Sequence, residues 1–210
     1  MRVLVLCDDH WHPASTVRQG LSPLADQGYE FEWLADAREW SAGRMDSFPL
    51  VILSKSNNVS AADDSNWVTS DVETAFLKYV CHGNGLLVIH SGTAGYQQCP
   101  TLRGLMGGVF LQHPAQCAVT VRPQAGHPLT VGASPFTVTD EHYFMQLDDE
   151  NASVFMTSQS DGGTQPAGWT RSEGAGRVCV LTPGHNVEVW LHPAYQVLLS
   201  NALHWCSPTH

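Results

Sequence analysis

The sequence predicts an α/β fold with a mainly parallel sheet, and three observations support this class. Short unbroken apolar runs, which strands covered on both faces need, recur through the first half of the chain. They alternate with segments of helical periodicity, which is typical of strand, helix, strand units. Apolar residues make up 43% of the chain and charged residues 14%, as in globular proteins. With 210 residues, no linker and no internal repeat, residues 1–210 are expected to form a single domain.

The first half predicts four strands and two helices. The strands are expected over residues 3–7, 30–33, 50–53 and 85–89. The first helix opens at Pro13 and carries apolar residues at helical spacing, although Pro23 should kink or shorten it. The second begins near Ser70 or Asp71 and closes at Gly83. A polar loop over residues 54–66 follows the third strand.

The second half has more proline and glycine and shorter strands. Strands are expected over residues 118–121 and 154–158, and a hairpin over 168–181 turns at 173–176. An amphipathic helix over 193–205 ends the pattern.

Composition excludes several classes of partner. The formal net charge of -10 disfavours nucleic acid and anionic membranes, and no stretch approaches the ~20 apolar residues of a membrane span. The amino terminus runs into Asp8 and Asp9 without a small-residue cleavage site, so we expect a first strand and a cytoplasmic protein. The six cysteines are scattered, without a C-x-x-C pair, and are expected as buried thiols.

The stretch "GLLVIHSGTAGY" predicts a buried strand ending in a sharp turn, which Gly92 permits. Hydrolases with such an elbow place a nucleophile there in a G-x-S-x-G pattern, but residues 89 and 93 around Ser91 are not glycine. No cysteine occupies the turn either. Acyl-enzyme chemistry is therefore disfavoured, and His90 is expected to be a base, a donor to substrate or a metal ligand.

Other polar residues follow the expected strands, where ligands bind in open parallel sheets. Each also has an ordinary structural explanation: a helix cap, a turn, a solvated carboxylate or a satisfied loop histidine. The candidates are Asp8, Asp9, His10 and His12 after the first strand, Asn57 and Asn58 after the third, His185 after the hairpin, and His113, Asp140, Glu141 and His142 in later loops. His82, His127, His192, His204 and His210 are expected at the surface or at helix ends.

Histidines with carboxylates are typical ligands of zinc and similar divalent ions. There is no H-E-x-x-H, and His10 with His12 is the only short-range pair. We name His10, His90 and His113 as candidate ligands of zinc, manganese or nickel.

The segments "GLLVIHSG", "GGVFLQHP", "GHPLT", "DEHYF", "PAGWTRSEGAGRV", "GHN" and "NALHW" occur in this order. Together they resemble the ThuA-like (trehalose utilisation) family over nearly the whole chain. The resemblance implies a class I glutamine amidotransferase-like fold, a three-layer α/β sandwich with a flavodoxin-like, mainly parallel sheet. His90 would then stand where an amidotransferase carries its cysteine, so no glutaminase activity and no nucleotide cofactor are expected.

The family is associated with breakdown of disaccharides through 3-keto-sugars. The resemblance implies a polar pocket lined by His90, His113, Asp140, Glu141 and His185. Of these, we expect His90, Asp140, Glu141 and His185 to be catalytic. Substrate-binding residues would be His12, Asn57, His113 and Trp169, the last as a sugar-stacking face. The segment "CDDHWHP" matches the family only loosely.

The first hypothesis is an enzyme of hydrolase, lyase or isomerase type that acts on a sugar or 3-keto-sugar by acid and base chemistry, with or without a metal. A non-catalytic sugar-binding or regulatory module is the alternative, and a structural subunit with a vestigial pocket is a third. The expected partner is a small carbohydrate. Apolar surface from Trp67, Trp190 or Trp205 would support a homo-oligomer, and buried tryptophans are the equally ordinary explanation.

Overall fold

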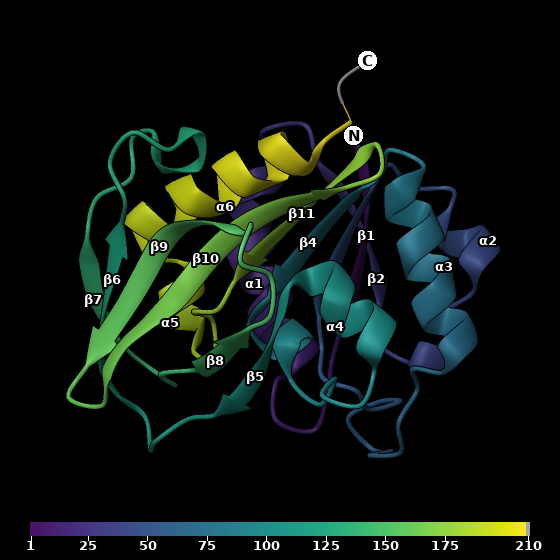
Figure 1. Cartoon of the computed structure of the whole chain (residues 1–210), viewed down its shortest axis with the longest axis horizontal. Helices are drawn as coiled ribbons and strands as arrows, with labels where there is room; N and C mark the ends of the chain where they lie inside the picture. The colour runs from purple at the N-terminus through teal and green to yellow at the C-terminus, as the bar shows by residue number, and fades with distance from the viewer. Residues whose placement is uncertain (209–210) are drawn as a thin grey trace.

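The computed structural model describes residues 1–208 and has a nine-stranded mixed sheet at its centre (Figure 1). In spatial order the strands are β2 (Glu30–Leu34), β1 (Arg2–Cys7), β3 (Leu50–Ser54), β4 (Gly85–Ile89), β11 (Gly176–Leu181), β10 (Gly163–Glu173), β9 (Ser153–Ser160), β6 (Cys117–Pro123) and β7 (Phe136–Asp140). Strands β5 (Gly108–Gln112) and β8 (Phe144–Leu147) pair separately.

The sheet has a parallel half and an antiparallel half. Strands β2, β1, β3, β4 and β11 are parallel, whereas β11, β10, β9, β6 and β7 pair antiparallel to one another. The parallel prediction thus holds for the half from β2 to β11. The chain order reverses around β1, whose neighbours are β2 and β3, and such a switch point opens a crevice beyond the strand ends.

Helices cover both faces of the parallel half. Alternate strand residues point to opposite faces, so Val3 and Val5 join one apolar cluster while Leu4 and Leu6 join the other. The first cluster packs against α1 (Ala14–Ala25), α5 (Val187–Trp190) and α6 (Pro193–Cys206). The second packs against α2 (Ala42–Met45), α3 (Ser70–Cys81) and α4 (Pro100–Met106). Burial on both faces explains why these strands read as unbroken apolar runs.

Most expected elements are confirmed with small changes of bounds. The hairpin of β10 and β11 pairs Glu173 with Gly176, as its turn sequence predicts. Pro23 lies inside the last turn of α1, which ends at Ala25. The prediction missed α2, α4, α5, β5, β7 and β8, because four to seven residues are too short to show a period. Single-turn 3-10 helices also occur over Ala37–Glu39, His90–Thr93 and Pro128–Thr130.

Several composition-based expectations can be compared with the structure. All six cysteines are free, and Cys7, Cys99, Cys179 and Cys206 are buried. Trp67 and Trp190 are buried in the clusters above, so they leave little apolar surface for an oligomer. Across residues 1–208, no helix combines the length and apolarity that a membrane crossing requires.

Candidate functional site

The candidate site begins at the elbow after β4. His90 has a φ of 47°, a left-handed conformation that non-glycine residues rarely adopt. Gly92 follows where a Cβ would lie 2.0 Å from the carbonyl oxygen of Leu53, so only glycine lets the turn pack against β3. The elbow therefore fixes the His90 side chain at the carboxyl edge of the parallel strands.

Three histidines converge there on one carboxylate. His12 comes from the loop after β1, His185 from the loop after β11, and Glu141 directly follows β7. Glu141 Oε2 lies 3.1 Å from His185 Nδ1, 3.5 Å from His90 Nε2 and 3.9 Å from His12 Nε2. One ligand atom from each of the four residues lies within 4.8 Å of all the others. We call these four residues the His/Glu cluster.

Neighbouring groups orient two of these imidazoles. His90 Nδ1 lies 2.8 Å from the Thr182 carbonyl oxygen, which can only accept, so Nδ1 carries the proton and Nε2 keeps its lone pair. His12 Nδ1 lies 2.8 Å from Asp9 Oδ1, which fixes His12 in the same way. In the neutral rings that a metal ion would select, both Nε2 lone pairs then point into the cluster, as in histidines that bind metals.

The cluster leaves buried polar atoms without hydrogen bonds. Among the described residues, His12 Nε2, His90 Nε2 and His185 Nδ1 are buried and lack a partner of hydrogen-bond geometry. Buried polar groups almost always have one, so three such atoms in one place require an explanation. Three imidazole nitrogens and a carboxylate oxygen match the donor set of zinc, manganese or nickel. The His/Glu cluster could hold such an ion.

The charges of the cluster favour a cation. Burial raises the pKa of Glu141, but the contacts with His12, His185 and His90 outweigh it and hold that pKa well below the usual range. Burial lowers the pKa of His12, yet its hydrogen bond to Asp9 and the nearby Glu141 carboxylate raise it to about 9. Burial lowers the pKa of His90. The Asp9 and Glu141 carboxylates thus place negative charge beside the imidazoles of the cluster.

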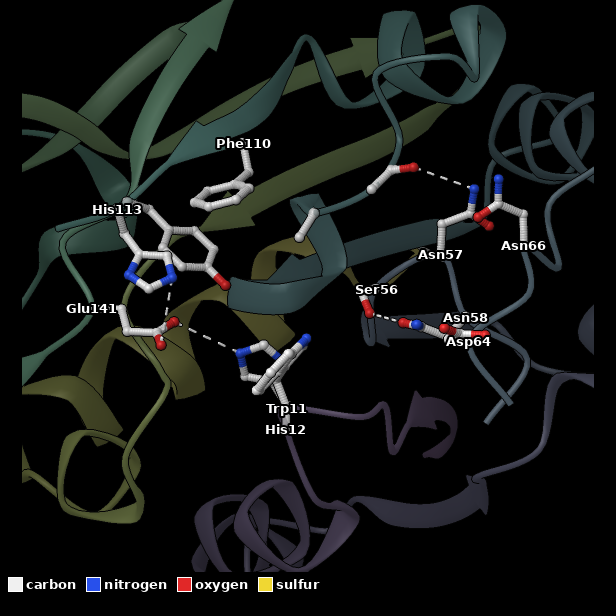
Figure 2. Close-up of a pocket in the computed structure, with 13 residues that line it drawn as sticks. Trp11, His12, Ser56, Asn57, Asn58, Asp64, Asn66, Phe110, His113 and Glu141 are labelled. Atoms are coloured by element: carbon white, nitrogen blue, oxygen red, sulfur yellow. Dashed lines mark hydrogen bonds and ion pairs between the residues drawn. The ribbon is translucent and has the colours of Figure 1, made fainter. Parts of the chain in front are cut away.

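A cavity of about 570 Å³ opens beside the cluster, and Figure 2 shows its lining. It reaches His12 and Glu141, whereas His90 and His185 are not part of its wall. Side chains of both polar and aromatic character line it: Trp11, His12, Ser56, Asn57, Asn58, Asp64, Asn66, Phe110, His113, Glu141 and Tyr143, with Ala94 and Gly95.

The structure places Asp140 and His113 beside the cluster. Asp140 is fully buried and accepts hydrogen bonds from the Gly184 amide at 2.9 Å and the His185 amide at 3.0 Å. It therefore positions the loop of His185 and does not line the cavity. His113 does line it, with Nε2 3.6 Å from Glu141 Oε1.

Two sequence-based assignments need correction. Trp169 cannot stack on a sugar, because it is 0% exposed and its indole donates to the Met106 carbonyl oxygen within the core. His10 is exposed and lies outside the His/Glu cluster; His12, two residues on, takes the ligand position instead. Asn57 does line the cavity, but its carboxamide already accepts from the Val68 amide.

Sequence reasoning assigned His12, His185 and Glu141 to substrate or catalysis and not to a metal, and it missed Trp11, Asp64 and Asn66 altogether. The useful signal for His12 was the nearby Asp9, since a carboxylate often orients a metal-binding histidine. No local pattern marks Asp64 or Asn66, which lie in a loop without periodicity.

Comparisons with known proteins agree with this architecture. A putative ThuA-like protein from Parabacteroides merdae has a similar structure, with a TM-score of 0.79 and 15% identity over 99% of this chain and 90% of that one. A cytoplasmic protein from Salmonella typhimurium LT2 has a TM-score of 0.75 and 15% identity, over 99% of this chain and 100% of that one. A β-galactosidase from Bacillus circulans has a TM-score of 0.70 and 13% identity, over 99% of this chain but 31% of that one.

No curated protein matches the sequence. The family model described as "ThuA: Trehalose utilisation" matches residues 2–206, nearly the whole chain. The chain therefore belongs to the ThuA (trehalose utilisation) family, which implies a carbohydrate-related role.

Proposed function

We propose that this protein is an enzyme of carbohydrate metabolism that acts on a sugar or 3-keto-sugar by acid and base chemistry, assisted by a divalent metal ion. One observation carries the proposal: three unpartnered, buried imidazole nitrogens converge on Glu141 at the wall of a cavity lined by polar groups. Membership of the ThuA family supports a sugar as the substrate.

The donor set fits a metal ion. His12 Nε2, His90 Nε2, His185 Nδ1 and a Glu141 oxygen would hold zinc, manganese or nickel, which would polarise a carbonyl or hydroxyl oxygen of the sugar. Asp9 and the Thr182 carbonyl keep two of the imidazoles oriented toward that point. The Asp140 carboxylate holds the His185 loop by accepting hydrogen bonds from the backbone amides of Gly184 and His185.

Proton transfer falls to residues that face the cavity. His113 lines the cavity beside Glu141 Oε1, within reach of a hydroxyl or of a carbon next to a carbonyl in the bound sugar. His113 would take or give the proton, and the Glu141 carboxylate would stabilise the imidazolium that forms. Because His90 occupies the elbow, this site has no cysteine to hydrolyse glutamine.

The proposal also covers the fold family, the cellular location and the partner of the protein. The elbow after β4 and the helices on both faces support the class I glutamine amidotransferase-like, flavodoxin-like sandwich. A cytoplasmic location and a small carbohydrate as the partner complete the proposal.

Metal content and turnover test the proposal together. Tag-free protein is purified without chelator, and metal per chain is measured by mass spectrometry in the wild type, His90→Ala and the matched control His82→Ala. His82 is an exposed histidine just after α3, before β4 begins, whereas the cluster lies beyond the carboxyl end of β4. Each sample is then supplied with zinc, manganese or nickel and incubated with 3-keto-glucosides, and the products are followed by chromatography.

We expect about one ion per chain in the wild type and in His82→Ala, with loss of both ion and turnover in His90→Ala. Absence of bound metal in all samples, even after addition, would refute the metal-assisted mechanism. Sugar binding without any product would show that the protein is a binding module and not an enzyme.

A further inference from the structure

The cavity extends well beyond the His/Glu cluster. In Figure 2, His113 and Glu141 lie at one side of it and Asn57 and Asn66 at the opposite side. The chemistry proposed above uses only the first side. The second side is built from Trp11 in the loop after β1 and from residues of the loop after β3, and these residues have no role in that chemistry.

Trp11 is the most unusual residue of the second side. Its side chain is 70% exposed, and it is the only aromatic residue among the exposed large hydrophobic residues of chain positions 1–208. An indole left in water at the wall of a cavity offers a flat apolar face to a ligand.

The backbone holds Trp11 in place. Its amide donates to Asp9 Oδ1 at 2.9 Å, and the turn is closed by hydrogen bonds between the backbones of Asp9 and His12. The same Asp9 carboxylate orients His12 in the cluster. A ligand on Trp11 thus meets a preorganised surface, which lowers the entropy lost on binding.

Polar side chains surround the second side. Asp64 and Asn66 line it, and no described residue hydrogen-bonds to either side chain, so both are available to a ligand. The Asn58 amide group is available as well, since only its oxygen is engaged, by the Ser56 hydroxyl. A pyranose ring matches such a site, because its C–H face is apolar and its edge carries hydroxyls that both donate and accept.

The charges of the cavity lining restrict the class of ligand to uncharged sugars. No lysine or arginine lines it, whereas Asp64 and Glu141 do. Phosphate and carboxylate groups bind best where cationic side chains pair with them, and two carboxylates repel them, so this cavity disfavours sugar phosphates and sugar acids.

We propose that Trp11, Asn58, Asp64 and Asn66 form a second sugar subsite, which binds an uncharged pyranose ring joined to the ring held at the His/Glu cluster. The inference rests on the proposed function, and its new element is the assignment of these residues of the chain to the second ring of the substrate. The ring that stacks on Trp11 contributes affinity and does not react.

Calorimetric titration of the zinc-supplied protein tests the subsite. The probes are trehalose, glucose and trehalose 6-phosphate, and the variants are Trp11→Ala, Trp11→Phe and the control Val131→Ala. Val131 is 71% exposed and lies outside the cavity, so it matches Trp11 in exposure. None of these changes touches the His/Glu cluster.

We expect wild-type protein to bind trehalose more tightly than glucose or trehalose 6-phosphate. Trp11→Ala should weaken trehalose binding about tenfold or more and leave glucose binding unchanged, whereas Trp11→Phe keeps most of the affinity. Val131→Ala should bind like the wild type.

Two other outcomes overturn the inference in distinguishable ways. If Trp11→Ala binds trehalose as tightly as the wild type, or if trehalose 6-phosphate binds best, the neutral second subsite is wrong while the sugar-directed function stands. If the wild type binds neither trehalose nor glucose, the proposed function fails and the subsite fails with it.

Discussion

The Asp9→Asn substitution offers a sharp test of how the His/Glu cluster is held. Asp9 is 1% exposed, and its Oδ1 accepts from the Trp11 amide, the His12 amide and His12 Nδ1 at 2.9, 3.0 and 2.8 Å. Its Oδ2 accepts from the Ser56 amide at 2.9 Å. One carboxylate therefore ties the loops after β1 and β3 together and fixes the His12 ring.

The size of the effect follows from these four hydrogen bonds. Asparagine keeps one oxygen, and the better orientation leaves that oxygen at the three donors and turns its NH₂ toward the Ser56 N–H. Two donors then oppose each other where a charged acceptor stood, which costs about 1.5–3 kcal/mol. For a chain of this size, that corresponds to a fall in melting temperature of about 3–12 °C.

Metal affinity should fall as well. His12 loses its anionic partner, and substitutions of such partners typically lower metal affinity about 10–100-fold. Zinc affinity is measured by competition with a chromophoric chelator, and stability by calorimetry with and without zinc.

Asp8→Asn is the matched control. It makes the same charge change one residue away, at a φ of 76° that asparagine tolerates, and the Asp8 side chain accepts only from the Ala14 amide. We expect zinc affinity within about twofold of the wild type. Wild-type zinc affinity in Asp9→Asn, or an equal loss in Asp8→Asn, would refute this account of the site.

The remaining predictions concern stability and the core. Gly92→Ala should destabilise the fold by about 3 kcal/mol, because the added Cβ would overlap the Leu53 carbonyl oxygen. Gly104→Ala, with open space around its Cβ, should stabilise α4 by up to about 1 kcal/mol. Equal urea midpoints of unfolding for the two variants would contradict the elbow packing. Lys55→Met should lower the free energy of unfolding, measured in urea, by about 3 kcal/mol or more. The buried Lys55 ammonium donates to three backbone carbonyls, one in each of the loops after β1, β2 and β3, and methionine would leave them without a donor. A loss below about 1 kcal/mol would show that these carbonyls find other donors. Trp169→Ala should lower the free energy of unfolding, measured in urea, by about 3–5 kcal/mol, because it leaves a cavity in the core. The trehalose affinity of the folded fraction should not change. A loss of affinity without a loss of stability would restore the role of Trp169 as a stacking face.

The sequence by itself determined the parts of this protein that local pattern controls. Unbroken apolar runs predicted β1, β3 and β4, because a strand buried on both faces has no polar positions. The elbow followed from Gly92 after such a run, and it placed His90 at the sheet edge. The ordered motifs also led to the family that the family model matches.

Only the tertiary structure decided which polar residues meet. The hairpin strand β11 inserts beside β4 and runs parallel to it, and this long-range pairing brings His185 to His90. The choice of His12 over His10 depends on Asp9 and Glu141, one of them more than a hundred residues away. Trp169 sits in a strand whose face is covered by α4, so the packing of that helix, and no local signal, buries it. Contacts between distant segments have no period in the sequence, which is why the site had to be seen folded.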